Sequence, residues 1–576
     1  MADLHFGSAA ATPAERVAVD AVVAPFGPAL LVESAHLVRG GTTRRAERRH
    51  LLLPALHALQ REAGWISPGG LRHVCEQLQV PPAEAYGVAT FYEMLRTTAP
   101  ATEGPIAHVC DDVACRIDPS RREAAVTALR AAGAAVHDSP CLGQCDRPPG
   151  VFVQHRRGSD EVPNDSGPFE LPQAGDPGLR LLRRVGVVDP TSLDSYLGQG
   201  GMAALGIARE IGGEAVIEAV AQAGLSGRGG AAFPTAAKWR AVRDASGDRR
   251  HVVVNFDESE PGTFKDKTLV ENDPFAVIEA MCIAALATGA ETGWVYVRGE
   301  YPRSVERLTS AVDQCRRAGY LGDAFDIEVR RGAGAYICGE ETALFNSIEG
   351  FRGEPRNKPP YPTTHGLFGQ PTAVNNTETL VNVLSILVEG PDAYRSVGTA
   401  QSPGTRLFSV SGRVGRPGLY EVPFGTTLGE LLDLAGGVTR DLAAVLLGGA
   451  AGSFVPADQL GLRLTLEDTR QAGVALGSGA VVVFDTSVDL TDTILRIASF
   501  FTAESCGQCV PCRLATVRQH ETLVQIAKRG EVTADQRELL GDLSQVLVDA
   551  SICGLGHTAA SAVQSALRLG LVGGGT

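Results

Sequence analysis

Three cysteines, each separated from the next by two residues, constrain this chain of 576 residues more than any other feature. They are Cys506, Cys509 and Cys512, and a fourth cysteine, Cys553, follows much further along the chain. Such a run folds three thiolates around one point, and a distant fourth completes the ligand set of a cubane [4Fe–4S] cluster, with one thiolate for each iron. A structural zinc site with four thiolates is the alternative, although such sites prefer paired C-x2-C segments. The even spacing favours the iron–sulfur cluster.

A second group of cysteines lies in the N-terminal third of the chain. Cys110 and Cys115 follow an apolar run typical of a strand, and Cys141 and Cys145 follow a helical stretch and another short run of this kind. Each pair therefore lies on a loop after a predicted strand, which allows the two pairs to meet. Two pairs of thiolates can hold the two irons of a [2Fe–2S] cluster. Spacing alone leaves a structural zinc site open as the alternative.

The other cysteines and the charge of the chain exclude several classes of protein. Cys75, Cys282 and Cys315 lie in helix-like apolar patterns, so we expect them to be small core residues. The N-terminus lacks the basic and apolar regions of a signal peptide, and no stretch approaches the ~20 apolar residues of a membrane span. We therefore expect a cytoplasmic protein with reduced thiols and no membrane insertion. A formal net charge of −14 argues against nucleic acid as the main partner.

Glycine is concentrated in a few short loops. Such loops are typical of places where the backbone closely approaches a ligand or another segment of the chain. Residues 224–239 read GLSGRGGAAFPTAAKW and follow a helical stretch over 208–223. They are not a dinucleotide-binding fingerprint, because that motif follows a strand. Exposed backbone amides, with Arg228 and Lys238 nearby, make phosphate binding plausible. A plain glycine-rich turn is the alternative.

An acidic loop follows the buried strand that is predicted over 251–255. It reads NFDESEPGTFKD and covers residues 255–266. Ligands in open α/β sheets bind at such strand ends. Several carboxylates there are costly unless they hydrogen-bond a partner, such as ribose hydroxyls or a flavin ring. A solvated acidic loop is the alternative.

Further polar loops occur downstream. A second strand-like run leads into RGAGAYICGEET (331–342), and the segments KPPYP (358–362) and TAVNNTET (372–379) come later. Glu340 and Glu341 begin a predicted helix, where carboxylates favour the positive end of the helix dipole, so helix capping is one interpretation of this pair. Together, loops rich in Gly, Asn and acid predict one nucleotide-sized pocket.

These loops resemble the flavin-bearing, NADH-oxidising subunit of the complex I family. The matching phrases lie within residues 224–560 and are GRGGAAFPTAAKW, NFDESEPGTFKDK, GAGAYICGEETAL, KPPYP, AVNNTET, ESCGQCVPC and SICGLG. Residues 50–155 resemble the smaller partner subunit of that family, a helical segment plus a thioredoxin-like [2Fe–2S] domain, through ATFYEML, VCDDVACR and PCLGQCD. Both parts are fused here, as in NAD-linked formate dehydrogenases and NAD-reducing hydrogenases of this family.

The resemblance implies four cofactors: FMN, NAD(H), one [4Fe–4S] cluster and one [2Fe–2S] cluster. The implied FMN-binding residues are Gly227, Gly229, Lys238, Asn255, Asp257, Ser259, Tyr336, Gly339, Glu340, Glu341, Asn375, Asn376 and Thr377. The nicotinamide nucleotide would stack over the flavin near Phe233 and Tyr361, with contacts from Glu260 and Lys238. The resemblance also favours iron–sulfur over zinc at the N-terminal cysteines. No catalytic acid or base is implied, because hydride transfer at FMN requires none.

The chain departs from the family pattern in the cofactor loops. Residues that differ from the usual ones are Ala232, Ala236, Ala241, Phe256 and Tyr361. In addition, only 25 residues separate Cys115 from Cys141, fewer than is usual. These departures bear on the shape of the cofactor pocket and on nucleotide affinity.

The implied fold class is α/β and multidomain. The expected segments are an N-terminal tail (1–45), a helical segment (46–103), a thioredoxin-like [2Fe–2S] domain (104–157), a linker rich in Pro, Gly and Asp (158–189), a Rossmann-like FMN- and NADH-binding domain (190–402), a β-grasp domain (403–486) and a C-terminal [4Fe–4S] helical bundle (487–576). Alternation over 407–423 predicts a hairpin, and a helix is expected from Thr427 onward.

The implied function is that of a diaphorase subunit, which exchanges hydride between NAD(H) and FMN and single electrons with the clusters. Its electron donor or acceptor lies on another chain, so we expect a hetero-oligomer with a large catalytic subunit. The segment SICGLGHTAASAV around Cys553 resembles formate dehydrogenases and hydrogenases more than complex I. We therefore favour the β subunit of a molybdenum- or tungsten-dependent, NAD-linked formate dehydrogenase. The diaphorase subunit of an NAD-reducing hydrogenase and a fused complex I subunit are the alternatives, and a structural zinc-binding scaffold is the alternative of another class.

Overall fold

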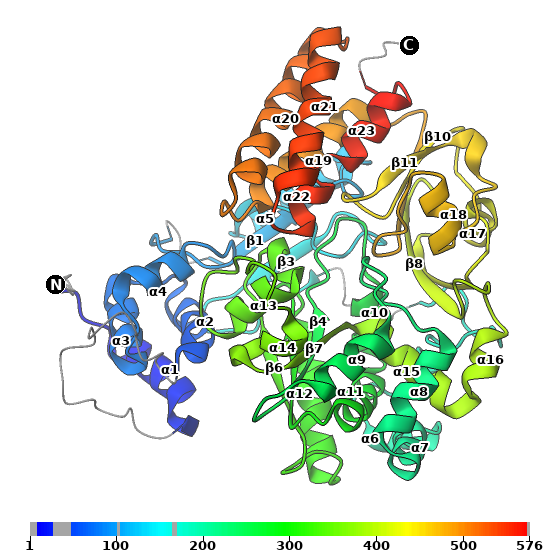
Figure 1. Cartoon of the computed structure of the whole chain (residues 1–576). Coiled ribbons are helices and arrows are strands. Elements are labelled where there is room, and N and C mark those ends of the chain that lie inside the picture. Colours follow the sequence, from blue (N-terminus) through cyan, green and yellow to red (C-terminus); the bar gives the residue numbers. More distant parts are fainter. Residues whose placement is uncertain (1–7, 27–47, 101–103, 164–169, 573–576) are drawn as a thin grey trace.

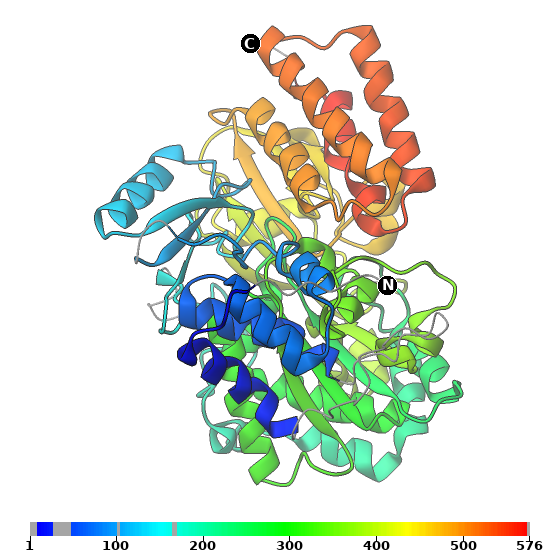
Figure 2. The ribbon, with the colours of Figure 1, turned by 90° about the vertical axis from the view of Figure 1, so that its left-hand side faces the viewer.

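The computed structural model describes residues 8–26, 48–100, 104–163 and 170–572. The chain folds into a large central domain, which carries the C-terminal helical bundle at one end and a β-rich domain at its side (Figure 1). The N-terminal helices lie against the central domain, and a small sheet domain stands beside them at the left of the view (Figure 2). The expected α/β multidomain fold is confirmed.

A four-stranded parallel sheet forms the core of the central domain. Its strands are ordered β6-β5-β4-β7, with bounds β4 (His251–Phe256), β5 (Thr292–Val297), β6 (Asp326–Arg331) and β7 (Thr372–Asn376). The valine run of β4 suits a strand that is buried on both faces. The strand predicted over 251–255 is therefore confirmed. The carboxyl ends of all four strands meet at one edge of the sheet, where ligands bind in open α/β folds.

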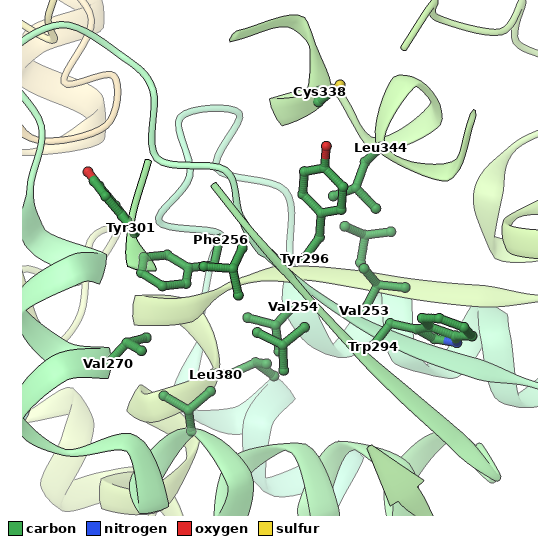
Figure 3. Packing of buried hydrophobic residues seen from close by; sticks show 14 of the residues in the cluster. Val253, Val254, Phe256, Val270, Trp294, Tyr296, Tyr301, Cys338, Leu344 and Leu380 are labelled. Carbon is green, nitrogen blue, oxygen red and sulfur yellow. The ribbon is translucent and has the colours of Figure 1, made fainter. Parts of the chain in front are cut away.

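Helices cover both faces of this sheet. Helix α11 (Pro274–Thr288) is apolar on all sides, because it packs between the sheet and the outer helices. Figure 3 shows Val253 and Val254 of β4 in this core together with Leu380. The helical stretch predicted over 208–223 is interrupted at Gly212, whose φ of 82° ends one helix and starts the next. The other helices of the domain are α6 (Leu193–Gly198), α7 (Ala203–Ile211), α8 (Gly213–Ala223), α9 (Thr235–Asp244), α10 (Lys265–Asn272), α12 (Pro302–Arg317), α13 (Glu341–Ile348), α14 (Pro362–His365), α15 (Thr377–Glu389) and α16 (Pro391–Arg395).

The N-terminal part is helical and begins earlier than predicted. Its helices are α1 (Pro13–Val23), α2 (Leu52–Ala63), α3 (Pro68–Leu78) and α4 (Pro82–Ala89). Helix α1 starts with a capping box between Thr12 and Glu15, and its Val19 is fully buried where it meets α2. The expectation of a tail is therefore wrong for residues 13–23, because this amphipathic helix packs on its neighbours. Residues 1–7 and 27–45 of the expected tail lie outside the described residues.

The small sheet domain has the predicted thioredoxin-like elements. Strand β1 (Ile106–Cys110) lies at its centre, parallel to β2 (Ala135–Ser139) and antiparallel to β3 (Val151–Gln154), and α5 (Pro119–Ala131) connects β1 to β2. Because β1 and β2 are parallel neighbours, the loops that follow them lie at the same edge. This arrangement brings the two predicted cysteine pairs together.

The connection after this domain is packed rather than free. Within the predicted linker, residues 170–189 form turns without a helix or strand. The Glu421 carboxylate accepts hydrogen bonds of 3.0 Å from the backbone N–H groups of both Leu181 and Leu182. A buried ion pair between Arg184 and Asp273, at 2.7 Å, ties the same segment to the central domain. The connection therefore fixes the position of the domains that it joins.

The β-rich domain is a mixed five-stranded sheet in the order β11-β10-β12-β8-β9. Its elements are β8 (Thr405–Gly412), β9 (Gly418–Pro423), α17 (Leu428–Leu434), β10 (Leu442–Leu447), β11 (Ser453–Pro456), α18 (Leu466–Gln471) and β12 (Ala480–Asp485). Strands β8 and β9 form the predicted antiparallel hairpin. Thr427 caps the predicted helix by accepting a hydrogen bond from the Glu430 N–H group.

The C-terminal bundle closes the chain. Its helices are α19 (Leu490–Glu504), α20 (Val510–Arg529), α21 (Ala534–Ala550), α22 (Gly554–Thr558) and α23 (Ser561–Arg568). Among the described residues, no helix of this bundle or of the other domains is long and apolar enough to cross a membrane.

Candidate functional site

A cavity of about 460 Å³ lies at the carboxyl ends of β4, β6 and β7. Many residues that the sequence predicts for FMN and NADH line it, namely Gly229, Asn255, Asp257, Ser259, Glu260, Tyr336, Gly339, Glu340 and Asn376. The Asn255 side chain donates a hydrogen bond of 2.7 Å to the Gly339 carbonyl, which ties the end of β4 to the loop after β6. The structure thus brings together loops that are far apart in the sequence.

Asn376, which lies directly before helix α15, lines one end of this cavity. Asn376 precedes the helix and makes no capping hydrogen bond, and its Nδ2 donates instead to Asp266 at 2.6 Å. The hydroxyl oxygen of Thr377 is buried and has no hydrogen-bond partner in the described parts of the chain. A Cβ atom at Gly229 would lie 3.2 Å from the Asn376 side chain, so glycine keeps this space open. The Glu378 N–H in the first turn of α15 donates to the Asp266 carboxylate at 3.1 Å, so a carboxylate already lies at this helix start. The unpaired Thr377 hydroxyl and the space beside Gly229 are the features here that fit the phosphate of FMN.

The carboxylates of the acidic loop are held by protein groups. Glu260 accepts hydrogen bonds from the Tyr336 hydroxyl at 2.6 Å and from the Ala451 N–H at 2.8 Å. Burial raises the pKa of Glu260 to about 7, and burial also raises the pKa of Asp257. The alternative of a solvated acidic loop is therefore wrong.

Buried charges at the cavity wall form an ion cluster. Lys265 is 1% exposed, and its Nζ lies 2.9 Å from Asp266 and 3.1 Å from Glu378. Glu258 lies beside this cluster, because its carboxylate accepts a hydrogen bond of 2.8 Å from the Asp266 backbone N–H. Lys265 is therefore held by two carboxylates and is not a free cation at the cavity wall.

Neither cation of the first glycine loop points into the cavity. Arg228 is 1% exposed and donates to the Tyr394 hydroxyl at 3.1 Å, while its guanidinium stacks 4.6 Å from the centre of the Phe424 ring. Lys238 donates to the Val374 carbonyl at 2.7 Å, and burial lowers its pKa. Both side chains therefore bind neighbouring protein groups outside the cavity lining.

Some of the predicted ligands lie outside the cavity lining. Gly227 pairs its N–H with the Phe233 carbonyl at 2.9 Å, and Asn375 accepts a hydrogen bond of 2.9 Å from Trp239. The Phe233 and Tyr361 side chains are 54% and 59% exposed. Exposed aromatic rings of this kind are available for stacking on a nucleotide base.

Glu340 and Glu341 share one cation. Lys358 donates to both carboxylates, at 2.9 Å and 2.7 Å. Glu340 also caps α13, because its carboxylate accepts the N–H groups of Thr342 and Ala343. Helix capping is therefore confirmed for Glu340, which lines the cavity at the same time.

Two departures from the family pattern have a structural explanation. Ala232, which stands where the family usually has glycine, adopts a φ of 53°, a left-handed conformation that favours glycine. Phe256 is fully buried, and its ring packs 5.6 Å from that of Tyr301 below the end of the strand (Figure 3). The bulk of Phe256 is therefore directed into the core and does not change the cavity.

The cavity has a wall that the sequence analysis missed. It comes from the β-rich domain and from the bundle, through Gly448, Ala451, Ala475, Gly477, Ser478, Gly554, Leu555 and Thr558. Gly448 and Gly477 adopt positive φ values of 93° and 53°. Glycine clusters at 448–449 and 477–479 were the available signal in the sequence.

The N-terminal helical segment supports the loop after β6. The backbone N–H groups of Glu93 and Met94 donate to the carbonyls of Gly334 and Ala333, at 3.1 Å and 3.0 Å. Tyr92 donates to the Ser347 hydroxyl at 2.8 Å, and that hydroxyl also contacts the Tyr296 hydroxyl at 2.9 Å. The phrase ATFYEML therefore packs directly against the loop that lines the cavity.

The C-terminal cysteines gather at the end of the bundle that faces the cavity. Cys509 immediately precedes α20 and Cys553 immediately precedes α22, while Cys512 lies in the first turn of α20. The Ser505 hydroxyl lies 3.3 Å from the Cys512 sulfur. Because Gly554 and Leu555 line the cavity, Cys553 is adjacent to it in the chain. Burial raises the pKa of Cys553 to about 12, which a bound metal ion would reverse.

The N-terminal cysteines are buried together. The Cys141 and Cys145 sulfurs lie 3.5 Å apart, and the Cys110 thiol is within hydrogen-bonding reach of those of Cys115 and Cys141. Backbone N–H groups point at them, from Gly150 to Cys115 at 3.3 Å, for example. In the described residues, no three His, Cys, Asp or Glu side chains surround a single ion position. In a [2Fe–2S] cluster four thiolates serve two irons, so two thiolates share each iron and a close pair of thiols fits this arrangement.

Four family profiles match the chain. They are the Nuo51 FMN-binding domain (residues 220–385), the NADH-ubiquinone oxidoreductase-F iron–sulfur binding region (492–569), the thioredoxin-like [2Fe–2S] ferredoxin (40–165) and the SLBB domain (407–451). Both cysteine groups fall within the profiles that are described as iron–sulfur binding. These matches favour iron–sulfur clusters over structural zinc at both sites.

Similar proteins fall into two groups. The F 2 subunit of NADH-quinone oxidoreductase from Rhizobium meliloti (strain 1021) is 41% identical over 399 residues, which cover 67% of this chain and 94% of the relative. The HndC subunit of NADP-reducing hydrogenase from Solidesulfovibrio fructosivorans is 39% identical over 399 residues, which cover 67% of this chain and 80% of the relative. A chain in the crystal structure of air-oxidised NAD⁺-reducing [NiFe]-hydrogenase superposes with a TM-score of 0.77 and 32% identity, over 91% of this chain and 93% of that chain.

Proposed function

The chain belongs to the complex I-related family of NADH-quinone oxidoreductase F subunits, and from this premise we propose that it is the NAD(H)-handling subunit of a larger complex, in which another subunit supplies or takes the electrons. It is a diaphorase-type subunit whose cofactors are FMN, NAD(H), one [4Fe–4S] cluster and one [2Fe–2S] cluster. When bound, the flavin supplies the exchange between a two-electron hydride and single electrons. The observation that carries the proposal is the cavity itself, which is lined by residues from the loops predicted to bind FMN and has Cys553 beside its wall.

We propose that the cavity residues hold FMN and the nucleotide as the resemblance implies. Thr377 and Asn376 would bind the phosphate, and Phe233 and Tyr361 would stack on the nucleotide at the mouth. Glu260 would contact the nicotinamide end, where its carboxylate is fixed by two donors. The protein's contribution is orientation and exclusion of water, because hydride transfer needs no acid or base from the chain.

We also propose the ligands of the two clusters. Cys506, Cys509, Cys512 and Cys553 would bind the [4Fe–4S] cluster, and Cys110, Cys115, Cys141 and Cys145 would bind the [2Fe–2S] cluster. The convergence of the four N-terminal thiols and the position of Cys553 beside the cavity support these assignments. Electrons would then leave the flavin through the C-terminal cluster.

For the electron donor we propose formate, oxidised by a molybdenum- or tungsten-containing large subunit that binds this chain. The resemblance of the segment around Cys553 supports this choice. Hydrogen is the second candidate, and the match over 91% of this chain with a chain of NAD⁺-reducing [NiFe]-hydrogenase favours it. A fused subunit of complex I is the third candidate, supported by the identity with F subunits.

Two experiments test these proposals. The purified chain should reduce an artificial dye with NADH in the absence of any partner, and rates no higher than those of free FMN would contradict the flavin site. The chain should then be purified from its native cells under mild conditions, and the large subunit that accompanies it identified by mass spectrometry. The same preparation should reduce NAD⁺ with formate, and reduction with hydrogen alone would favour the second candidate.

A further inference from the structure

Arg298 occupies a position between the two redox sites. It directly follows β5, and its side chain is 4% exposed. One terminal nitrogen, Nη1, donates to the Glu258 carbonyl of the acidic loop at 2.9 Å, and the other, Nη2, donates to the carbonyl of Cys141. One guanidinium therefore contacts both the loop that lines the cavity and the loop that carries two cysteines.

Neighbouring groups hold this guanidinium in place. The Tyr301 hydroxyl donates to the same Glu258 carbonyl at 3.2 Å, and the Tyr301 ring lies 5.3 Å from the Arg298 guanidinium carbon. A Cβ atom at Gly143 would lie 1.8 Å from the Tyr301 hydroxyl, so the cysteine loop can approach this closely only with glycine there. Glu300 is the counter-charge of Arg298, at 3.0 Å.

We propose that Arg298 sets the reduction potential of the [2Fe–2S] cluster and holds the ligand loop of that cluster against the flavin site. This inference rests on the proposed ligation by Cys141 and its three partner cysteines. Arg298 is a positioning residue, since it contacts the backbone of a ligand and not the reacting atoms.

The direction of the effect follows from charge. Reduction adds one electron to the cluster, and a buried cation nearby stabilises the more negative, reduced form. Arginine suits this position because its guanidinium stays protonated and its donors form a planar fork. Glu300 acts in the opposite sense, because its carboxylate disfavours added negative charge. Removing Arg298 should therefore lower the reduction potential, and neutralising Glu300 should raise it.

The test is a potentiometric titration of the full chain, with the [2Fe–2S] signal followed by electron paramagnetic resonance. The variants are Arg298→Gln, Arg298→Lys and Glu300→Gln, and Arg317→Gln is the control because it removes the same charge from an exposed position on α12. We expect a lower midpoint potential for Arg298→Gln, a smaller shift for Arg298→Lys, a higher potential for Glu300→Gln, and no shift for the control. The [4Fe–4S] potential should stay unchanged in all four variants.

Unchanged potentials in Arg298→Gln and Glu300→Gln, with the [2Fe–2S] signal intact, would overturn the inference. If Arg298→Gln does not retain its cluster, the midpoint potentials of Arg298→Lys and Glu300→Gln provide the test. Shifts of opposite sign support the inference, and shifts of the same sign overturn it. Failure of the proposed ligation looks different, because the unmodified chain would then lack a [2Fe–2S] signal altogether.

Discussion

The hydroxyl of Tyr336 donates a hydrogen bond of 2.6 Å to the carboxylate of Glu260. The backbone N–H of the same tyrosine donates a hydrogen bond of 2.8 Å to the carboxylate of Glu504. Glu504 lies two residues before the first cysteine of the C-terminal group. One residue therefore joins the acidic loop of the cavity to the segment that carries the cluster ligands. A movement of either segment would therefore be transmitted to the other through the two hydrogen bonds of Tyr336.

The stability of the chain should depend on pH through Glu260. Burial raises the pKa of its carboxyl from 4.5 to about 7, so the stability that its neutral form contributes is complete below pH 4.5 and is lost as pH rises through 7. Glu260→Gln stays neutral throughout and should gain on the order of 1–3 kcal/mol over the unmodified chain at pH 8, with no gain near pH 4.5. Thermal unfolding at both pH values measures this. An equal difference at both would contradict the assignment.

The N-terminal helical segment should strengthen FMN binding. Tyr92→Phe removes the hydrogen bond to Ser347, worth about 1 kcal/mol, so we expect about fivefold weaker FMN retention. Flavin release after dilution, followed by fluorescence, measures the change. Tyr86→Phe is the matched control, because Tyr86 is 52% exposed on α4. Equal retention in the two variants would show that the contact does not reach the flavin site.

The chain should use NADH in preference to NADPH. The cations nearest the cavity are already engaged, since Lys265 is paired with Asp266 and Glu378 and Arg228 is bound to Tyr394. A 2′-phosphate without a partner should cost about 1.4 kcal/mol or more, which is a tenfold lower kcat/KM. Dye-linked kinetics with the two nucleotides test this. Equal kcat/KM values would mean that another cation reaches the phosphate.

The two cysteine groups should have separable roles. Cys553→Ser should abolish electron transfer to the partner subunit and spare NADH–dye activity, because Cys553 lies next to the cavity wall. Cys115→Ser should reduce partner-linked turnover less, because we propose that electrons leave the flavin through the C-terminal cluster. Iron and flavin contents must be measured in parallel, since loss of a thiolate can unfold its domain. Normal partner-linked turnover in Cys553→Ser without its [4Fe–4S] signal would refute the path.

Local patterns made part of this structure predictable. Cysteine spacing and the loops after predicted strands identified both cysteine groups and one side of the cavity, because ligand spacing and strand ends are properties of short segments. The start of helix α1 also has a local signal, because Thr12 and Glu15 form a capping box.

The rest depends on contacts between distant segments. Gly448 and Leu555 line the cavity, although they lie far along the chain from the loops that follow the strands of the central sheet. Arg298 is one of many arginines in the sequence, and only the folded chain shows that it bridges Glu258 and Cys141. Likewise, the left-handed conformation of Ala232 is invisible until its backbone angles are known.

The pairing of residues 93–94 with residues 333–334 has a consequence for how the protein behaves at low concentration. In a two-chain arrangement, such a contact would be an association that weakens on dilution. Fusion into one chain turns it into an intramolecular contact with an effective concentration on the order of millimolar. The scaffold of the flavin pocket is then equally complete in a dilute assay and in a crowded cell.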